Sequence, residues 1–146
     1  MDSCELVPGK GIRCGDAEVY FGMARKALRE TLGWKPTAET LWDDEDEYMR
    51  ADGEDWLRLR FLDGKLCDIE VLGGELRHEG LELKSTSWSA LEPALETLGH
   101  GLRKTQWLGE GKDCVALHVN IATHDDVGGD GDGIEWVITS SDFHNE

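Results

Sequence analysis

Two stretches of the chain repeat their apolar residues at helical spacing. The first predicts a helix over residues 23–32, ended by Gly33. The second predicts a helix that begins at Ser89, where Ser89 and Glu92 have the spacing of a capping box, and that ends at Gly99. The residues expected on the buried faces are Met23, Ala27, Leu28, Thr31 and Leu32 in the first helix, and Leu91, Ala94, Leu95 and Leu98 in the second. Each helix is therefore expected to pack one face against a core.

Between these helices, strict alternation of apolar and polar residues predicts a β-hairpin. Its apolar positions are Leu57, Leu59 and Phe61 in the first arm, and Cys67, Ile69 and Val71 in the second. A two-residue turn would place Leu59 opposite Asp68, whereas a three-residue loop pairs Leu59 with Cys67. Since the second register pairs apolar with apolar, we predict the three-residue loop. A pairing of Phe61 with Leu66 would contradict it.

Alternation later in the chain predicts two further strands. A long, half-buried strand is expected over residues 114–121, with His118 and Asn120 on its polar face. Another is expected over residues 134–139, beyond a loop rich in Gly and Asp. We therefore predict an α+β fold of two helix-plus-antiparallel-strand units, with both helices packed on one face of a mainly antiparallel sheet.

The length of 146 residues fits one domain, predicted to span residues 1–146. The order of helix and strands occurs twice, and the tetrapeptide Glu-Thr-Leu-Gly ends both predicted helices. An internal duplication of about residues 12–75 and 85–140 is therefore a possible origin of the chain.

Charge changes this picture most. The chain has 15 basic and 31 acidic residues, a net charge of −16, which argues against nucleic acid and acidic membranes as partners. The acidic residues are concentrated in two windows. Residues 39–55 hold nine carboxylates and one Arg, and residues 122–146 hold seven carboxylates and no Lys or Arg. The remainder of the chain is almost neutral, so the charge belongs to two segments.

Motifs for catalysis or metal binding are lacking. The acidic residues 125–135 lack the ligand spacing of an EF-hand, and Cys114 and His118 lie too far apart along a strand for one zinc ion. No strained nucleophile turn or phosphate-binding loop is present. The four cysteines are scattered, so we expect buried or incidental thiols. We predict a protein that is not an enzyme and has no metal or other cofactor.

Tryptophan lies close to the acidic windows. Trp42 precedes the run of residues 43–47, and Trp56 follows it on the solvent face of the predicted hairpin. An aromatic anchor beside carboxylates suits a basic protein partner, because the field steers encounter and the ring supplies contact area. The alternative is that the tryptophans are core residues and the acidity promotes solubility. The predicted partner-binding residues are Trp42, Asp43, Asp44, Glu45, Asp46, Glu47, Trp56, His118, Asn120, Asp125, Asp126, Asp130 and Asp132.

The segment of residues 18–33 resembles the helix opening of outer-membrane assembly lipoprotein domains of the BamE type. In those domains a Gly-Met pair precedes a helix that ends in Leu-Gly, as Gly22-Met23 and Leu32-Gly33 do here. The tandem order of helix and strands is similar to that of the β-lactamase-inhibitory-protein family, a duplicated version of that fold. A small, acidic chain without an enzyme motif also resembles the immunity proteins of bacterial toxin systems. That resemblance implies tight binding to a cognate toxin.

We therefore predict a proteinaceous inhibitor, an immunity protein that occludes a cognate bacterial toxin with a basic surface. The alternatives are a small-ligand or cation-binding module and a structural domain that self-associates. Residues 1–10 lack the basic start and apolar core of a secretion signal, and no apolar run approaches the roughly 18 to 20 residues of a membrane span. A cytoplasmic location is expected.

Overall fold

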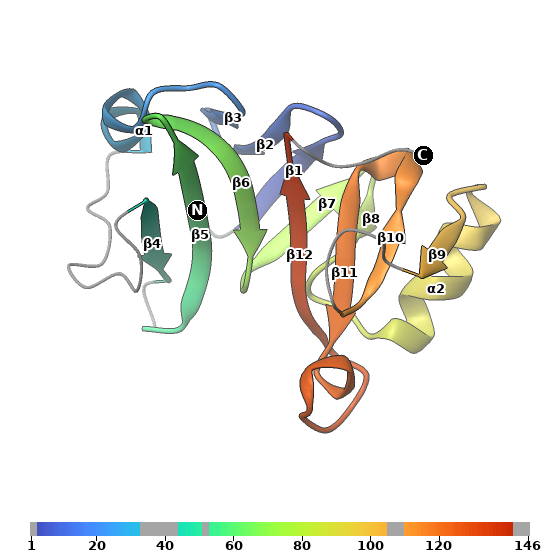
Figure 1. The fold of residues 1–146 in the computed structure, drawn as a ribbon. Coiled ribbons are helices and arrows are strands. Elements are labelled where there is room, and N and C mark those ends of the chain that lie inside the picture. Colours follow the sequence, from blue (N-terminus) through green and yellow to red (C-terminus); the bar gives the residue numbers. More distant parts are fainter. Residues whose placement is uncertain (1–2, 33–43, 51–52, 105–109, 142–146) are drawn as a thin grey trace.

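A computed structural model describes residues 3–32, 44–50, 53–104 and 110–141 (Figure 1). In this part of the chain the strands form two sheets. The seven-stranded sheet has the order β4 (Glu45–Met49), β5 (Asp55–Leu62), β6 (Lys65–Val71), β12 (Ile134–Ser140), β11 (Val119–Thr123), β10 (Lys112–Cys114) and β9 (Leu102–Lys104). The five-stranded sheet has the order β3 (Ala17–Tyr20), β2 (Gly11–Cys14), β1 (Ser3–Val7), β7 (Glu75–His78) and β8 (Leu81–Glu82).

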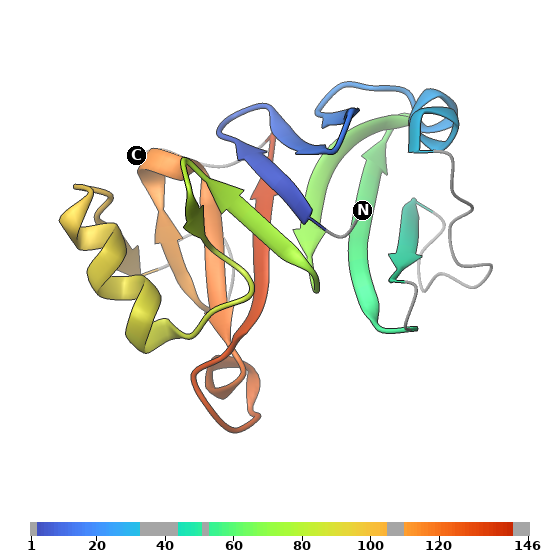
Figure 2. The ribbon, with the colours of Figure 1, turned by 180° about the vertical axis from the view of Figure 1, so that it is seen from behind.

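The two sheets pack face to face around one apolar core. Figure 2 shows β1, β2 and β7 lying across the inner face of the seven-stranded sheet. The core residues are Leu6, Ile12, Val19 and Leu76 from the five-stranded sheet, and Leu57, Leu59, Ile69, Val71, Val119, Ile121 and Val137 from the seven-stranded sheet. A β-sandwich buries these two faces without a helical layer.

The predicted α+β class, with both helices on one sheet face, is therefore wrong. The helices α1 (Arg25–Leu32) and α2 (Trp88–Thr97) lie at opposite ends of the molecule (Figure 1). Each buries a narrow stripe, Leu28 and Leu32 in α1 and Leu91 and Leu95 in α2, which confirms only part of each predicted face. Ala27, Thr31 and Leu98, which were also expected to be buried, are exposed. The inner sheet face is covered instead by strands from residues 3–20 and 75–82. The sequence does not predict these strands, because their runs of alternating apolar and polar residues are short and are interrupted by glycine.

The predicted register of the β5–β6 hairpin is also wrong. Phe61 pairs with Leu66, across a two-residue turn in which Asp63 and Gly64 have φ of 53° and 76°. Positive φ at both positions defines the type I′ turn favoured by an Asp-Gly pair. A β-bulge then leaves Cys67 as an extra residue, so that Leu59 faces Ile69. The bulge therefore lets apolar residues of β5 face apolar residues of β6, although a strictly alternating pattern does not predict it.

The long strand expected over residues 114–121 is two strands. After β10 the chain makes a short 3-10 turn, Val115–Leu117, and reverses through His118, which has φ of 56°. The strand over residues 134–139 is confirmed as β12, one residue longer. His118 therefore lies in the connection, and Asn120 is fully buried in β11.

Two of the four cysteines are not incidental thiols. Cys4 and Cys14 face each other across the β1–β2 ladder and form a disulfide. Cys67 and Cys114 are buried thiols outside this disulfide, as expected. None of the helices in the described ranges has the length and apolarity needed to cross a membrane. The single domain and its possible duplication stay predictions.

Candidate binding groove

The outer face of the seven-stranded sheet carries a ladder of alternating charges. The side chain of Arg58 lies between two carboxylates, with its Nε 3.1 Å from Glu47 Oε2 and its Nη1 3.0 Å from Glu70 Oε2. Beside it, Arg60 pairs with Asp68 on the neighbouring strand. Cross-strand pairs of opposite charge stabilise a sheet, so much of the acid on β4 and β6 is neutralised within the protein.

A groove of about 410 Å³ lies on this outer face, next to the charge ladder. Its lining residues are Asp55, Arg58, Glu70, Leu72, Glu110, Glu135, Trp136 and Ile138. They come from β5, β6, β12 and the residues adjoining these strands and β10, and they combine an apolar part with four carboxylates and one Arg. With the carboxylates ionised, the lining has a net charge of −3, from one positive and four negative groups.

A β-bulge in β12 brings two of these residues to the groove. Ala122 pairs with Trp136 and Thr123 pairs with Ile134, so Glu135 is the extra residue between them. Bulges turn a side chain away from its regular direction, and here both Glu135 and Trp136 line the groove. The Glu135 carboxylate also lies 2.5 Å from His124 Nδ1.

A buried polar network holds the Trp136 indole in place. Trp136 Nε1 donates a hydrogen bond of 2.8 Å to Asn120 Oδ1. Asn120 Nδ2 in turn donates to Asp113 Oδ1 at 3.0 Å and to the Glu110 carbonyl at 3.1 Å. Asn120 and Asp113 are both 0% exposed. The buried Asn120 amide therefore holds both the Trp136 ring and the backbone of Glu110, a second residue of the groove.

The carboxylates of the groove differ in their surroundings. Burial raises the pKa of Glu70, and its ion pair with Arg58 offsets only part of that shift. Asp55 and Glu110 are exposed and, among the described residues, make no ion pair. The groove therefore keeps negative charge that the protein does not itself neutralise.

The first predicted acidic segment is largely structural. Trp42 and Asp43 lie outside the described residues, and Asp44 is exposed. Asp46 is 1% exposed and accepts hydrogen bonds from Arg25 and Arg29 of α1 at 2.6–3.0 Å. Burial alone would raise the pKa of Asp46, but the hydrogen bonds from these two guanidinium groups lower it below its ordinary value.

The other members of that segment have internal contacts as well. Burial raises the pKa of Glu45, whose carboxylate lies 3.9 Å from Arg58 Nε. Trp56 is not on the solvent face, because it is the extra residue of a bulge in β5 and is 3% exposed within the core. Sequence reasoning places Trp56 outside because it assumes unbroken alternation.

The second acidic segment forms a separate pocket of about 350 Å³ beside the start of α2. Asp125, Asp126 and Asp132 line it together with Trp88 and Lys112. Two of the carboxylates have local roles. Asp126 Oδ2 accepts a bond from Thr123 N at 2.9 Å, and Asp132 Oδ2 accepts one from Ser89 N at 3.2 Å. Hydrogen bonding by Ser89 lowers the pKa of Asp132.

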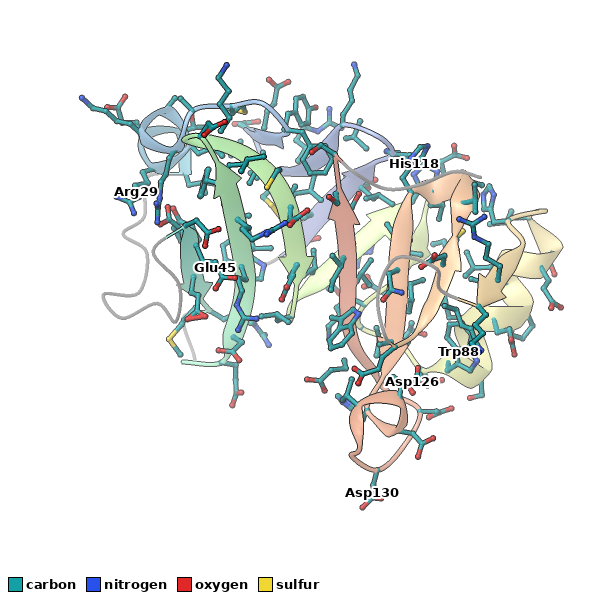
Figure 3. All side chains as sticks on the ribbon, in the orientation of Figure 1. Arg29, Glu45, Trp88, His118, Asp126 and Asp130 are labelled. Atoms are coloured by element: carbon teal, nitrogen blue, oxygen red, sulfur yellow. A yellow bond between two sulfur atoms is a disulfide. The ribbon has the colours of Figure 1, made fainter. Side chains whose placement is uncertain are left out.

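The structure does not bring the predicted residues into one site. Figure 3 shows Glu45 on the β4–β5 side, His118 in the β10–β11 connection, and Asp126 and Asp130 in the loop before β12. Asp130 points away from the sheets at the tip of that loop. Among the described members, Glu45 and Glu47 contact Arg58 of the groove, and Asn120 contacts Trp136 and Glu110 as a buried support.

The groove residues Glu70, Glu110, Glu135 and Trp136 were missed as site residues. One signal was available in the sequence. Ile134 and Val137 are both core residues three positions apart, which breaks the period of two and marks a bulge. Glu110 lies near β12 only in the tertiary structure, and no pattern of neighbouring residues in the sequence predicts this.

No family model matches the chain, and no curated protein or solved structure matches it either. Among the described residues, no group of three or more His, Cys, Asp or Glu side chains is arranged to hold a metal ion.

Proposed function

We propose that this protein is a proteinaceous inhibitor that binds a basic partner protein through the outer face of its seven-stranded sheet. In its specific form, the proposal is an immunity protein that occludes a cognate bacterial toxin. Inhibition then requires tight binding alone, without a catalytic step by this chain.

The observation that carries the proposal is the acidic groove around Trp136. None of the described helices or strands covers this face of the sheet, as Figure 1 shows. Aromatic side chains in preformed pockets supply much of the energy of protein interfaces, and uncompensated charge accelerates the encounter with a partner of opposite sign. Asp55 and Glu110 supply that charge beside the aromatic ring.

The structure changes which acidic residues are proposed as contacts. Asp46 is excluded because its carboxylate is occupied by α1, and Glu45 is nearly buried beside Arg58. The proposed contact surface is centred on the groove. Glu47 lies at its border, where it accepts a hydrogen bond from the groove residue Arg58. The exposed residues 125–132 form a secondary region.

The proposal is tested by co-expression with a toxin encoded next to this gene. Growth should be restored when this protein is produced with the toxin. The purified pair should associate at least about tenfold more slowly at high salt than at low salt, because long-range attraction is screened. Lack of protection by any adjacent toxin, or an association rate that ignores salt, would contradict the proposal.

Variants of equal charge change locate the contact. Asp55→Asn combined with Glu110→Gln should weaken binding by at least about tenfold, because both carboxylates lie in the groove. The matched control is Asp16→Asn combined with Glu18→Gln, which removes two exposed carboxylates at the β2–β3 turn. An equal loss of affinity in both double variants would show that net charge alone weakens binding, and it would contradict a contact at the groove.

The cytoplasmic location belongs to this proposal and has a direct test. Disulfides persist mainly in oxidising compartments, and Cys4 and Cys14 form one here. Thiols of the protein from its native host can be alkylated under denaturing conditions and counted by mass. Four modified cysteines support the cytoplasm, whereas two support an oxidising compartment.

A further inference from the structure

We propose that the groove on the outer sheet face is a receptor for a single arginine side chain of the partner, with the guanidinium stacked on the Trp136 indole between the carboxylates of Asp55 and Glu110. This inference rests on the proposed function, since it names the chemistry that the partner presents to that site.

The lining of the groove suits a planar cation. Trp136 and Ile138 give it an apolar part, and four carboxylates also line it. A guanidinium stacks on an indole face and is more weakly hydrated than an ammonium, so it loses less on entering a half-apolar groove. It also presents several N–H donors in one plane, which matches carboxylates on more than one side. Arginine therefore fits better than lysine.

The protein itself already uses this chemistry next to the groove. The guanidinium of Arg58 lies between Glu47 and Glu70, bonded to both at about 3 Å. These bonds occupy Arg58 and leave it unable to neutralise Asp55 and Glu110, which have no ion pair among the described residues. The groove lining thus retains a net charge of −3 for an incoming cation.

The groove is also built before any partner arrives. The Asn120 amide fixes the Trp136 ring at 2.8 Å and the Glu110 backbone at 3.1 Å from the same buried position. Gly111 permits this close approach, because a Cβ there would lie 2.8 Å from Asn120 Oδ1 and 2.6 Å from the Ile121 carbonyl. A prepositioned ring binds with less loss of side-chain entropy. This arrangement explains why an asparagine is buried at the centre of a sheet.

The test uses three short peptides, each with one central residue flanked by glycine: arginine, lysine or citrulline. Citrulline has the shape of arginine without its charge. Binding is followed by NMR through the indole N–H resonances of ¹⁵N-labelled protein, with Trp136→Phe identifying the Trp136 signal. The arginine peptide should shift that signal saturably at up to about 10 mM, at least about fivefold more tightly than the lysine peptide. The citrulline peptide should leave the signal unchanged.

The double variants of the preceding section then separate the groove from bulk charge. Asp55→Asn with Glu110→Gln should weaken arginine-peptide binding by at least about fivefold, and Asp16→Asn with Glu18→Gln should not change it. Equal binding of arginine and citrulline peptides, no shift of the Trp136 signal, or equal loss in both double variants would overturn the inference.

Failure here and failure of the proposed function can be told apart. A toxin that is neutralised without any change in the Trp136 signal would disprove the arginine receptor and leave the inhibitor proposal intact. Arginine-peptide binding together with no protection from a toxin would support the receptor and contradict the inhibitor.

Discussion

Single acidic residues in this protein have opposite roles that their side chains alone do not reveal. Asp46 joins α1 to β4 through two arginines and is 1% exposed, whereas Asp44, two positions earlier, is exposed. Both belong to one run of five carboxylates in the sequence. Asp46 differs from Asp44 because Arg25 and Arg29, from a helix about twenty residues earlier, donate hydrogen bonds to its carboxylate.

Replacement of Asp46 should therefore destabilise the fold. Asp46→Asn is expected to lower the free energy of unfolding at pH 7 by about 1–3 kcal/mol, because the guanidinium groups of Arg25 and Arg29 lose a charged acceptor. Urea unfolding measures the change. The control Asp44→Asn should stay within about 0.5 kcal/mol of the wild type.

The same pair of proteins gives a pH test. Because the pKa of Asp46 is lowered by folding, its contribution to stability is complete above about pH 4 and is lost as the pH falls through its folded pKa. The difference in stability between wild type and Asp46→Asn should shrink in that acidic range. A difference that stays constant down to acid unfolding would show that the charge of Asp46 is not the cause.

Asn120 is the second residue whose role is decided by burial. Asn120→Ala should lower the free energy of unfolding by about 2–4 kcal/mol, because it leaves a cavity, removes the acceptor of Trp136 Nε1 and removes one hydrogen bond to Asp113. Trp136→Phe removes only one of those hydrogen bonds and should cost about 1 kcal/mol. Guanidinium unfolding of both variants measures these changes. A smaller loss for Asn120→Ala than for Trp136→Phe would contradict the network.

At the scale of elements, bulges decide which residues reach the outer sheet face. Cys67 in β6 and Glu135 in β12 are each the extra residue of an irregular ladder. The β5–β6 hairpin, the strand over residues 134–139 and both helices were predictable because periodicity is local in the sequence. The hairpin register was not, because a two-residue turn followed by a bulge also pairs apolar with apolar residues, as a longer loop would, but with different partners.

The turn of this hairpin supplies a test at its own scale. Gly64→Ala should lower the free energy of unfolding by about 1 kcal/mol, because φ of 76° is unfavourable for a residue with Cβ. Gly101→Ala is the matched control, since a Cβ there would meet open space and its φ is not in the left-handed region. Thermal unfolding of both variants measures the difference. An equal effect of the two substitutions would contradict the type I′ turn.

At the scale of the whole molecule, net charge opposes compactness. With 31 acidic and 15 basic residues, repulsion among unpaired carboxylates outweighs the attraction of exposed ion pairs such as Arg60–Asp68. Sodium chloride should therefore raise the free energy of unfolding at pH 7, because it screens the repulsion. The same salt should have a smaller effect near the isoelectric point of about 4.6. Equal responses at both pH values would contradict this balance.

The sequence by itself determined the helices, the main alternating strands and the concentration of acid in two windows, because each is a property of neighbouring residues. The tertiary structure alone decided that a second sheet covers the first, since the parallel pairing of β1 with β7 joins residues about seventy positions apart. It also decided which carboxylates remain available. Residues 45–47 are paired with arginines of α1 and β5, whereas Glu70 and Glu110 line one groove with Trp136 only because distant segments of the chain meet.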